Sequence, residues 1–134
     1  MKPIIIDANG AVFGRVCSLA AKKALAGNEV IVINSEKAVI TGNKHDIVGK
    51  YMAIRKKGGH SRKGPRYSMI PYKILKWGIR GMLPNHRWGQ GKAAFARIKC
   101  YNGVPQLAKG HETVSITTAK KIKSIPVGEL SQKI

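Results

Sequence analysis

Residues 4–34 read IIIDANGAVFGRVCSLAAKKALAGNEVIVIN, in which two short β-branched runs flank a helical pattern. The runs, in residues 4–6 and 29–34, are unbroken apolar stretches, which is typical of buried strands. Between them apolar side chains recur at three- and four-residue steps, and Gly27 ends the pattern. The residues of this apolar face are Phe13, Val16, Cys17, Ala20 and Ala24. Strand, helix and strand in about thirty residues predict a βαβ unit with parallel strands.

The sequence after this unit adds further helical patterns and one more strand. The predicted elements are a helix around Ile47, Tyr51 and Ile54, a helix over 72–79 that begins at Pro71, a short helix within 92–97 and a strand over 98–101. Together they predict a small α/β fold, with a mainly parallel sheet, helices on both faces and long basic loops. The 134 residues fit a single domain, 1–134.

Two segments do not fit these patterns. Residues 56–68 are rich in Lys, Arg and Gly, so they predict a basic loop that reaches beyond the body of the protein. The tail, residues 111–134, is the least defined part of the chain. Residues 113–116 suit either a strand or an extended segment on a partner, and we expect the last dozen residues to become ordered on binding.

The charge of the chain is the strongest indication of its function. From Ile47 to His111 there is no Asp or Glu, while fifteen Lys and Arg fall in the same stretch, and the whole chain has a formal net charge of +19. Like charges on one surface repel each other unless a polyanion neutralises them. The sequence therefore predicts a nucleic-acid partner. The alternative, a basic face that serves solubility alone, needs a net charge of only about 2 to 8.

Several other function classes are disfavoured by the residue inventory. Gly10 and Gly14 lack the G-x-G-x-x-G spacing of a dinucleotide site, although the helix N-terminus beside Arg15 could hold one backbone phosphate. The six carboxylates and four histidines are scattered, and Cys17 and Cys100 form no zinc pattern. We therefore expect no enzyme activity, no cofactor, no metal and no small-molecule substrate.

The N-terminal sequence and the overall hydropathy bear on location. Asp7 follows only three isoleucines, too soon for the apolar core of a signal peptide, and no apolar run is 18 residues long. We expect a cytoplasmic protein with no membrane partner.

Basic residues, glycines and aromatic rings alternate between residues 55 and 97, and this mixture suits RNA. Lys and Arg bind phosphates, and rings stack on the unpaired bases that folded RNA displays. Trp77, flanked by helical apolar residues, is better explained by core packing, whereas Trp88 is expected to face RNA. The candidate RNA-binding residues are Arg15, Arg55, Lys56, Lys57, His60, Arg62, Lys63, Arg66, Tyr67, Lys73, Lys76, Arg80, His86, Arg87, Trp88, Lys92 and Arg97.

Specific motifs resemble a known family. Residues 80–84 read RGMLP, residues 94–105 read AFARIKCYNGVP, and the N-terminal half contains the Gly14-Arg15 and Lys50-Tyr51 pairs. Over residues 3 to 105 the sequence resembles the large-subunit ribosomal protein L13 family. The Gly64-Pro65 pair and the short chain resemble its archaeal and eukaryotic branch, and the lack of a long C-terminal extension favours the archaeal one.

The resemblance implies a small three-layer α/β domain with a mainly parallel sheet. It also implies a structural constituent of the large ribosomal subunit that binds large-subunit rRNA beside neighbouring ribosomal proteins and supports subunit assembly and translation. By matching position it places rRNA contacts on Arg15, Arg80 and Arg97 and on the basic segments around Pro71. Residues 66–70 depart from the family pattern, so contacts there are expected to use different atoms. The alternative function is a general DNA-compacting protein, which would need an even basic ridge or a groove-reading helix.

Overall fold

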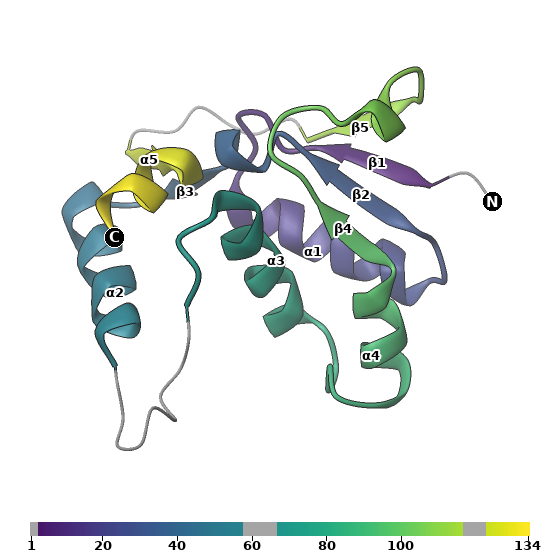
Figure 1. Ribbon diagram of the computed structural model, residues 1–134, viewed down its shortest axis with the longest axis horizontal. Helices are drawn as coiled ribbons and strands as arrows, with labels where there is room; N and C mark the ends of the chain where they lie inside the picture. Colours follow the sequence, from purple (N-terminus) through teal and green to yellow (C-terminus); the bar gives the residue numbers. More distant parts are fainter. Residues whose placement is uncertain (1–2, 58–66, 117–122) are drawn as a thin grey trace.

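The N-terminal βαβ unit is the centre of the fold. The computed structural model describes residues 3–57, 67–116 and 123–134. Strand β1 (Ile4–Asp7), helix α1 (Phe13–Leu25) and strand β2 (Val30–Ile33) form as the sequence predicts. β1 and β2 pair in parallel, with Ile5 opposite Ile31. Strands β4 (Ile98–Cys100) and β5 (Thr113–Ser115) complete a parallel sheet in the order β4-β2-β1-β5 (Figure 1).

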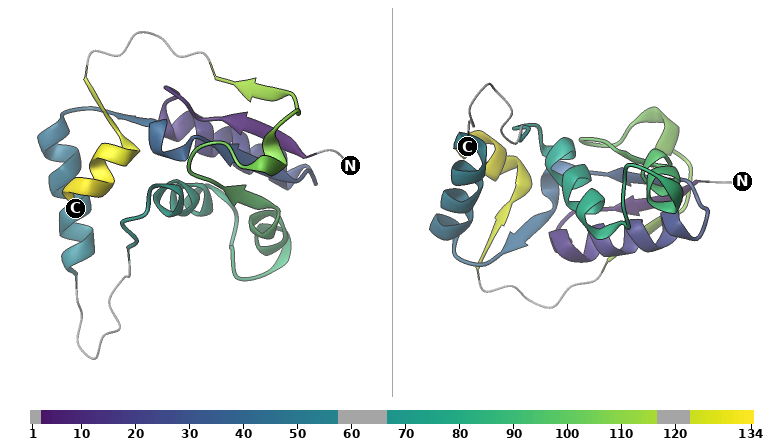
Figure 2. Two further views of the ribbon diagram at one scale, coloured as in Figure 1. Left: turned by 45° about the horizontal axis from the view of Figure 1, so that its top comes forward. Right: turned by 90° about the horizontal axis from the view of Figure 1, so that it is seen from below.

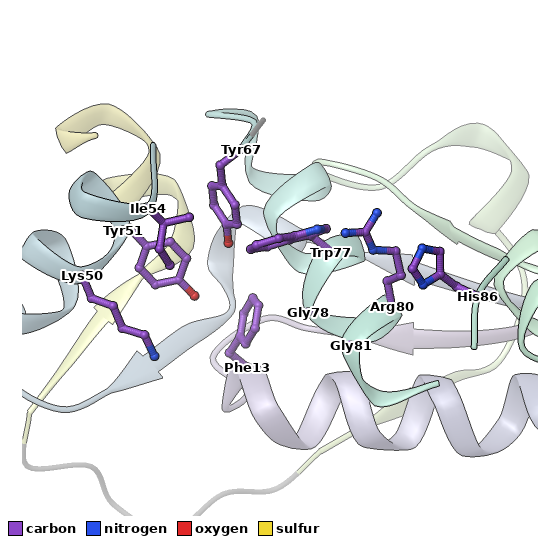
Figure 3. A pocket seen from close by; sticks show the side chains of 10 residues that line it. All are labelled: Phe13, Lys50, Tyr51, Ile54, Tyr67, Trp77, Gly78, Arg80, Gly81 and His86. Carbon is purple, nitrogen blue, oxygen red and sulfur yellow. The ribbon is translucent and has the colours of Figure 1, made fainter. Parts of the chain in front are cut away.

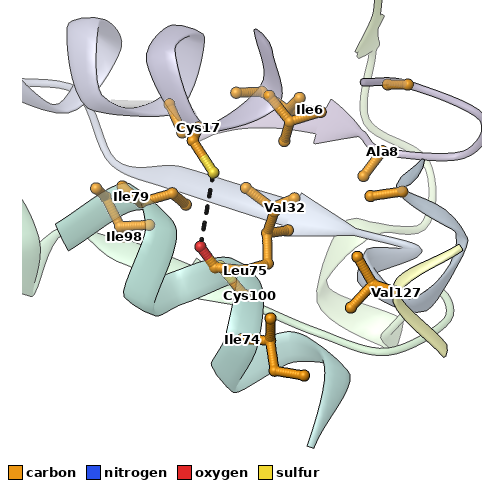
Figure 4. Close-up of a cluster of buried hydrophobic side chains, with 14 of the residues drawn as sticks. Ile6, Ala8, Cys17, Val32, Ile74, Leu75, Ile79, Ile98, Cys100 and Val127 are labelled. Carbon is orange, nitrogen blue, oxygen red and sulfur yellow. Dashed lines mark hydrogen bonds between the residues drawn. The ribbon is translucent and has the colours of Figure 1, made fainter. Parts of the chain in front are cut away.

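The α-helices that cover this sheet lie on one of its faces. Helix α1 packs there beside α3 (Pro71–Met82) and α4 (Gly89–Ala96), as the left view of Figure 2 shows. Val16, Leu75 and Ile98 are fully buried between these layers. Cys17 belongs to the same cluster, and its thiol donates a hydrogen bond to the carbonyl oxygen of Leu75 at 3.7 Å (Figure 4).

The opposite face of the sheet has a thinner cover than the sequence predicts. Ile5, Ile31 and Ile33 point to this side and are buried with Ala108 and the ring of Tyr101. The cover is the 3-10 helix η3 (Gln106–Ala108) and the chain leading to it. The α/β class and the mainly parallel sheet are confirmed. The expectation of α-helices on both faces is corrected, because short chain segments can bury three isoleucines without another helix.

Helix α2 (Lys44–Lys56) begins at Asn43, whose side-chain oxygen accepts a hydrogen bond from the backbone N–H of His45 at 3.2 Å. It has no fully buried residue, and one face of it rests on the core through partly buried apolar side chains. The predicted helices at Ile47, Pro71 and residues 92–97 are thus confirmed, with longer bounds than expected. Lys56 is the last residue of α2 and not part of the loop.

The C-terminal residues are part of the core, which corrects the expectation that they become ordered only on binding. Strand β6 (Ser124–Pro126) pairs antiparallel with β3 (Val39–Thr41) and leads into helix α5 (Val127–Lys133). Ile125, Val127 and Leu130 are fully buried. Helices α2 and α5 lie side by side at one end of the molecule, beyond the parallel sheet (Figures 1 and 2). For residues 113–116, the strand alternative is confirmed by β5.

One polar junction closes the carboxyl ends of β1 and β2. Asp7 Oδ1 accepts hydrogen bonds from the side chain of Asn34 at 3.0 Å and from the backbone N–H of Asn9 at 2.9 Å. Asn34 has a φ of 54°, in the left-handed region that Asn tolerates better than most residues. Glu36, in the 3-10 helix η1 (Ser35–Lys37), accepts from the backbone N–H of Gly103 at 3.0 Å. These carboxylates hold turns together.

Candidate nucleic-acid interface

Helices α3 and α4 and the turn between them carry exposed cations. Lys73, Arg87 and Lys92 are all exposed. Within residues 3–57, 67–116 and 123–134, the ion pairs are Lys44 with Glu129 and Lys133 with Glu129, the latter at 3.4 Å. The first pair joins α2 to α5, and the second lies within α5. The cations of α3 and α4 therefore have no carboxylate partner among the described residues, and their charge is available to an external anion.

Three of the predicted cations also contribute to the fold. Lys76 Nζ lies 5.0 Å from the centre of the Phe95 ring, and the Arg80 guanidinium lies 5.6 Å from that of Trp77. The guanidinium of Arg97 donates a hydrogen bond to the carbonyl oxygen of Ala24 at 3.0 Å. That carbonyl is in the last turn of α1, where a cation stabilises the helix dipole. Sequence patterns alone did not indicate this structural role of Arg97.

A cavity of about 400 Å³ opens between α2, α3 and the start of α1. Aromatic rings gather around it: Phe13 from α1, Tyr51 from α2, Trp77 from α3 and Tyr67 from the segment before α3 (Figure 3). The Tyr67 and Trp77 ring centres are 4.2 Å apart with planes at 79°, and those of Tyr51 and Tyr67 are 5.4 Å apart at 60°. These edge-to-face contacts fix the rings with respect to one another.

The charged groups at the cavity are basic. Lys50, Arg80 and His86 line it together with the rings (Figure 3). Burial raises the pKa of Tyr51 and, more strongly, that of Tyr67, so both phenols are neutral at physiological pH. None of the ten described residues that line the cavity is acidic. The site combines flat apolar surfaces with a positive rim.

The structure places the remaining candidate residues as follows. Arg15 is exposed in the first turn of α1, and Arg55 and Lys56 are exposed in the last turn of α2, followed by exposed Lys57. His60, Arg62, Lys63 and Arg66, like most of the predicted loop 56–68, lie outside the described residues. Of the candidate residues, Tyr67, Arg80 and His86 line the cavity together, while Lys73 lies on α3, Arg87 and Trp88 lie in the turn 83–88, and Lys92 lies on α4.

The two tryptophans differ from each other. Trp88 is 71% exposed, as expected for a ring that faces a partner. Trp77 retains 36% exposure, so the core-packing interpretation is only partly right: its ring packs on Tyr67 and also lines the cavity. Phe13, Lys50 and Tyr51 were not predicted as site residues. The Lys50-Tyr51 pair within the family resemblance was an indication of two of them, and Phe13 was expected only as part of the apolar face of the first helix.

Both cysteine thiols are buried in the core. Burial raises the pKa of Cys100 to about 12 and that of Cys17 further, so both are neutral thiols in the core. Residues 3–57, 67–116 and 123–134 contain no group of three His, Cys, Asp or Glu side chains that could hold a metal ion. No helix within these ranges is long and apolar enough to cross a membrane.

Comparison with known proteins matches residues 1–107 to the family described as Ribosomal protein L13. The large ribosomal subunit protein uL13 of Methanosarcina barkeri is 42% identical over 136 residues, which cover 97% of this chain and 96% of that relative. The chain belongs to the ribosomal protein L13 family. Its counterpart in Methanococcus maripaludis is also 42% identical, over 96% of this chain and 95% of the relative.

The similarity to L13 relatives extends past the motifs that first suggested it. The uL13 of Natronomonas pharaonis is 38% identical over 98% of this chain, so the C-terminal segment aligns as well. This agrees with the burial of β6 and α5 in the core. These relatives come from archaea. By their names, these L13 relatives are proteins of the large ribosomal subunit.

Proposed function

We propose that this L13 protein is a structural constituent of the large ribosomal subunit that binds large-subunit rRNA through the surface of α3, the turn 83–88 and α4. The observation that carries the proposal is the set of exposed cations, Lys73, Arg87 and Lys92, with no carboxylate partner among the described residues. Trp88 follows Arg87 in the turn 83–88, and Arg80 and His86 line the cavity. Such a surface binds phosphates and releases their counterions.

An irregular RNA fold suits this surface better than a DNA duplex does. The cations are distributed over two helices and a turn, and they do not form an even ridge along one helix. Trp88 stands 71% exposed among them, where it can stack on an unpaired base, and a duplex does not display such bases. The DNA-compacting alternative has no supporting observation of this kind. Neighbouring ribosomal proteins complete the set of partners, and the protein acts on the ribosome without catalysis, cofactor or metal, supporting subunit assembly and translation.

Filter binding of the full chain to large-subunit rRNA tests this proposal, with duplex DNA of equal phosphate content as competitor. If about 6 to 10 phosphates are contacted, affinity falls roughly 10³- to 10⁵-fold between 50 and 200 mM salt. The rRNA complex should also survive an excess of duplex DNA. A flat salt response, or equal displacement by rRNA and by duplex, would overturn the proposal.

A further inference from the structure

We propose that the aromatic cavity between α2, α3 and the start of α1 binds one unpaired nucleobase extruded from folded rRNA. This inference rests on the proposed function and adds to it a site that reads an RNA base and not only phosphates. The occupant is a base with its flanking phosphates. The cavity is defined by Phe13, Tyr51, Tyr67 and Trp77, with Lys50, Arg80 and His86 at its edge.

The size and lining of the cavity suit a flat ring. Its volume of about 400 Å³ lies in the range of pockets that hold small organic ligands, roughly 300 to 1,000 Å³. The ring centres of Trp77 and Tyr67 are 4.2 Å apart in an edge-to-face contact, yet 36% of Trp77 remains exposed. An exposed aromatic surface that is already fixed by its neighbours offers stacking without ordering a mobile side chain.

The charges decide between possible occupants. A cage of aromatic rings can also bind a cation such as a methylated ammonium group. Here Lys50 and Arg80 would repel a cation, and no acidic residue is among the described lining residues. The same two cations attract the phosphates on either side of an extruded base. Charge complementarity therefore favours a nucleotide over a cationic ligand.

The backbone leaves space for this arrangement at Gly78. A Cβ built on Gly78 would come within 2.6 Å of Phe13 Cε1 and 2.7 Å of Cζ. The absence of a side chain thus lets the Phe13 ring approach α3 closely and line the cavity (Figure 3). Gly81, one turn on, also lines the cavity, and a Cβ there would meet nothing within 4 Å. The small residues of α3 keep the cavity open towards its rim.

The chain has two tryptophans, so Trp88→Phe leaves Trp77 as the single indole reporter. We would titrate this variant with a ribo-adenosine pentamer and with an abasic pentamer of the same charge. The base-bearing pentamer should change Trp77 fluorescence in a saturable way, and the abasic one should not. Equal responses to both, or none to either, would overturn the pocket proposal. The control variant is Trp77→Phe, in which Trp88 is the single tryptophan. Its fluorescence reports base stacking outside the cavity.

A second measurement uses rRNA itself and separates the two proposals. Trp77→Ala should weaken rRNA binding about 5- to 150-fold, the range of one base–aromatic stack, without changing the slope of affinity against salt. Trp77→Phe should restore most of the affinity. Melting temperatures of both variants would identify loss of fold, in which case the fluorescence titration decides. The Trp77 variants could instead bind rRNA as tightly as the parent, with the same steep salt dependence. That result would overturn the proposal that the cavity binds a base, and it would leave the proposed rRNA-binding function in place.

Ultraviolet cross-linking in intact large subunits gives a test that needs no variant. Peptides containing Tyr67 or Trp77 should carry a nucleotide adduct. Cross-links from these peptides to a neighbouring ribosomal protein would show that a peptide fills the cavity and would overturn the proposal. Absence of rRNA binding in the filter assay would instead overturn the proposed function as a whole.

Discussion

Gly78 of α3 lies directly against the ring of Phe13 of α1, and a Cβ at this glycine would come within 2.6 Å of the ring. It would also come within 3.1 Å of Cys17 Sγ, in the buried face of α1. The two helices therefore approach each other at a point where any side chain on α3 is too large. This contact joins the scaffold to the candidate site, because Phe13 both packs against α3 and lines the aromatic cavity.

Gly78→Ala should destabilise the protein even though Ala favours helix. Overpacking costs about 1 to 3 kcal/mol, against about 1 kcal/mol gained from helix propensity. The matched control is Gly81→Ala in the same helix, where the added Cβ meets nothing within 4 Å and should be neutral or stabilising. Thermal unfolding of both variants measures the difference. Equal melting temperatures would show that Phe13 moves aside freely.

Leu130→Ala should cost about 2 to 5 kcal/mol, the range for a buried leucine. Leu130 is fully buried against the core although it lies close to the end of the chain. Leu107→Ala is the control: Leu107 is 56% exposed, so its replacement should change the free energy of unfolding by no more than about 0.5 kcal/mol. Denaturant titration tests the pair. A small effect at Leu130 would mean that α5 contributes little to the cooperative unit.

The prediction for the C-terminal tail failed because its contacts are long-range. Val127, Leu130 and Ile134 do follow helical spacing, but a seven-residue helix is too short to stand alone. Its stability comes from pairing of β6 with β3, more than 80 residues earlier in the chain, and local patterns do not encode such a pairing. By contrast, β1, α1 and β2 were predictable, since their unbroken β-branched runs and their apolar helix face are local.

The candidate site likewise has features that the sequence predicts and features that it does not. Its charge could be predicted, because sixty-five residues without a carboxylate leave the basic residues without partners nearby in sequence. The cavity could not, since Phe13, Tyr51 and Trp77 come from three helices and meet only in the tertiary structure. Arg97 was predicted from the family resemblance as an RNA contact. Its hydrogen bond to Ala24 depends on how α1 ends, which the residue spacing does not reveal.

The buried thiols should make the protein less stable at alkaline pH. Burial raises the pKa of Cys100 to about 12 and that of Cys17 further, against about 9.0 for a free thiol. Above about pH 9 the thiols of the unfolded chain lose their protons, whereas the buried thiols of the folded chain keep theirs. The free energy of unfolding therefore falls as pH rises. The stabilisation is complete below about pH 9 and is lost progressively towards pH 12.

Thermal unfolding between pH 8 and 11 measures this effect. The double variant Cys17→Ala, Cys100→Ala will be less stable at neutral pH because of the cavities it creates. Its loss of stability with pH should nevertheless be shallower than that of the parent, whose slope includes up to about 1.4 kcal/mol per pH unit for each thiol. Parallel curves for parent and variant would contradict the assignment of raised thiol pKa values.

Removing exposed cations should weaken rRNA binding without unfolding the protein. In the triple variant Lys73→Gln, Arg87→Gln, Lys92→Gln, all three positions are exposed and lack a carboxylate partner among the described residues. Exposed substitutions usually change stability by no more than about 0.5 kcal/mol, and removal of like charges relieves repulsion. The slope of log affinity against log salt should shrink by about 0.7 to 0.9 for each phosphate that the variant no longer neutralises.

Val16→Asp provides the opposite control. Val16 is fully buried on the inner face of α1, so a carboxylate there has no hydrogen-bonding partner and the domain should unfold before RNA is involved. Circular dichroism and filter binding on both variants separate the two effects. The triple variant should melt like the parent and bind with a smaller salt slope, and Val16→Asp should lose both structure and binding. If the triple variant keeps the parent's salt slope, the phosphate-binding surface does not lie on α3 and α4.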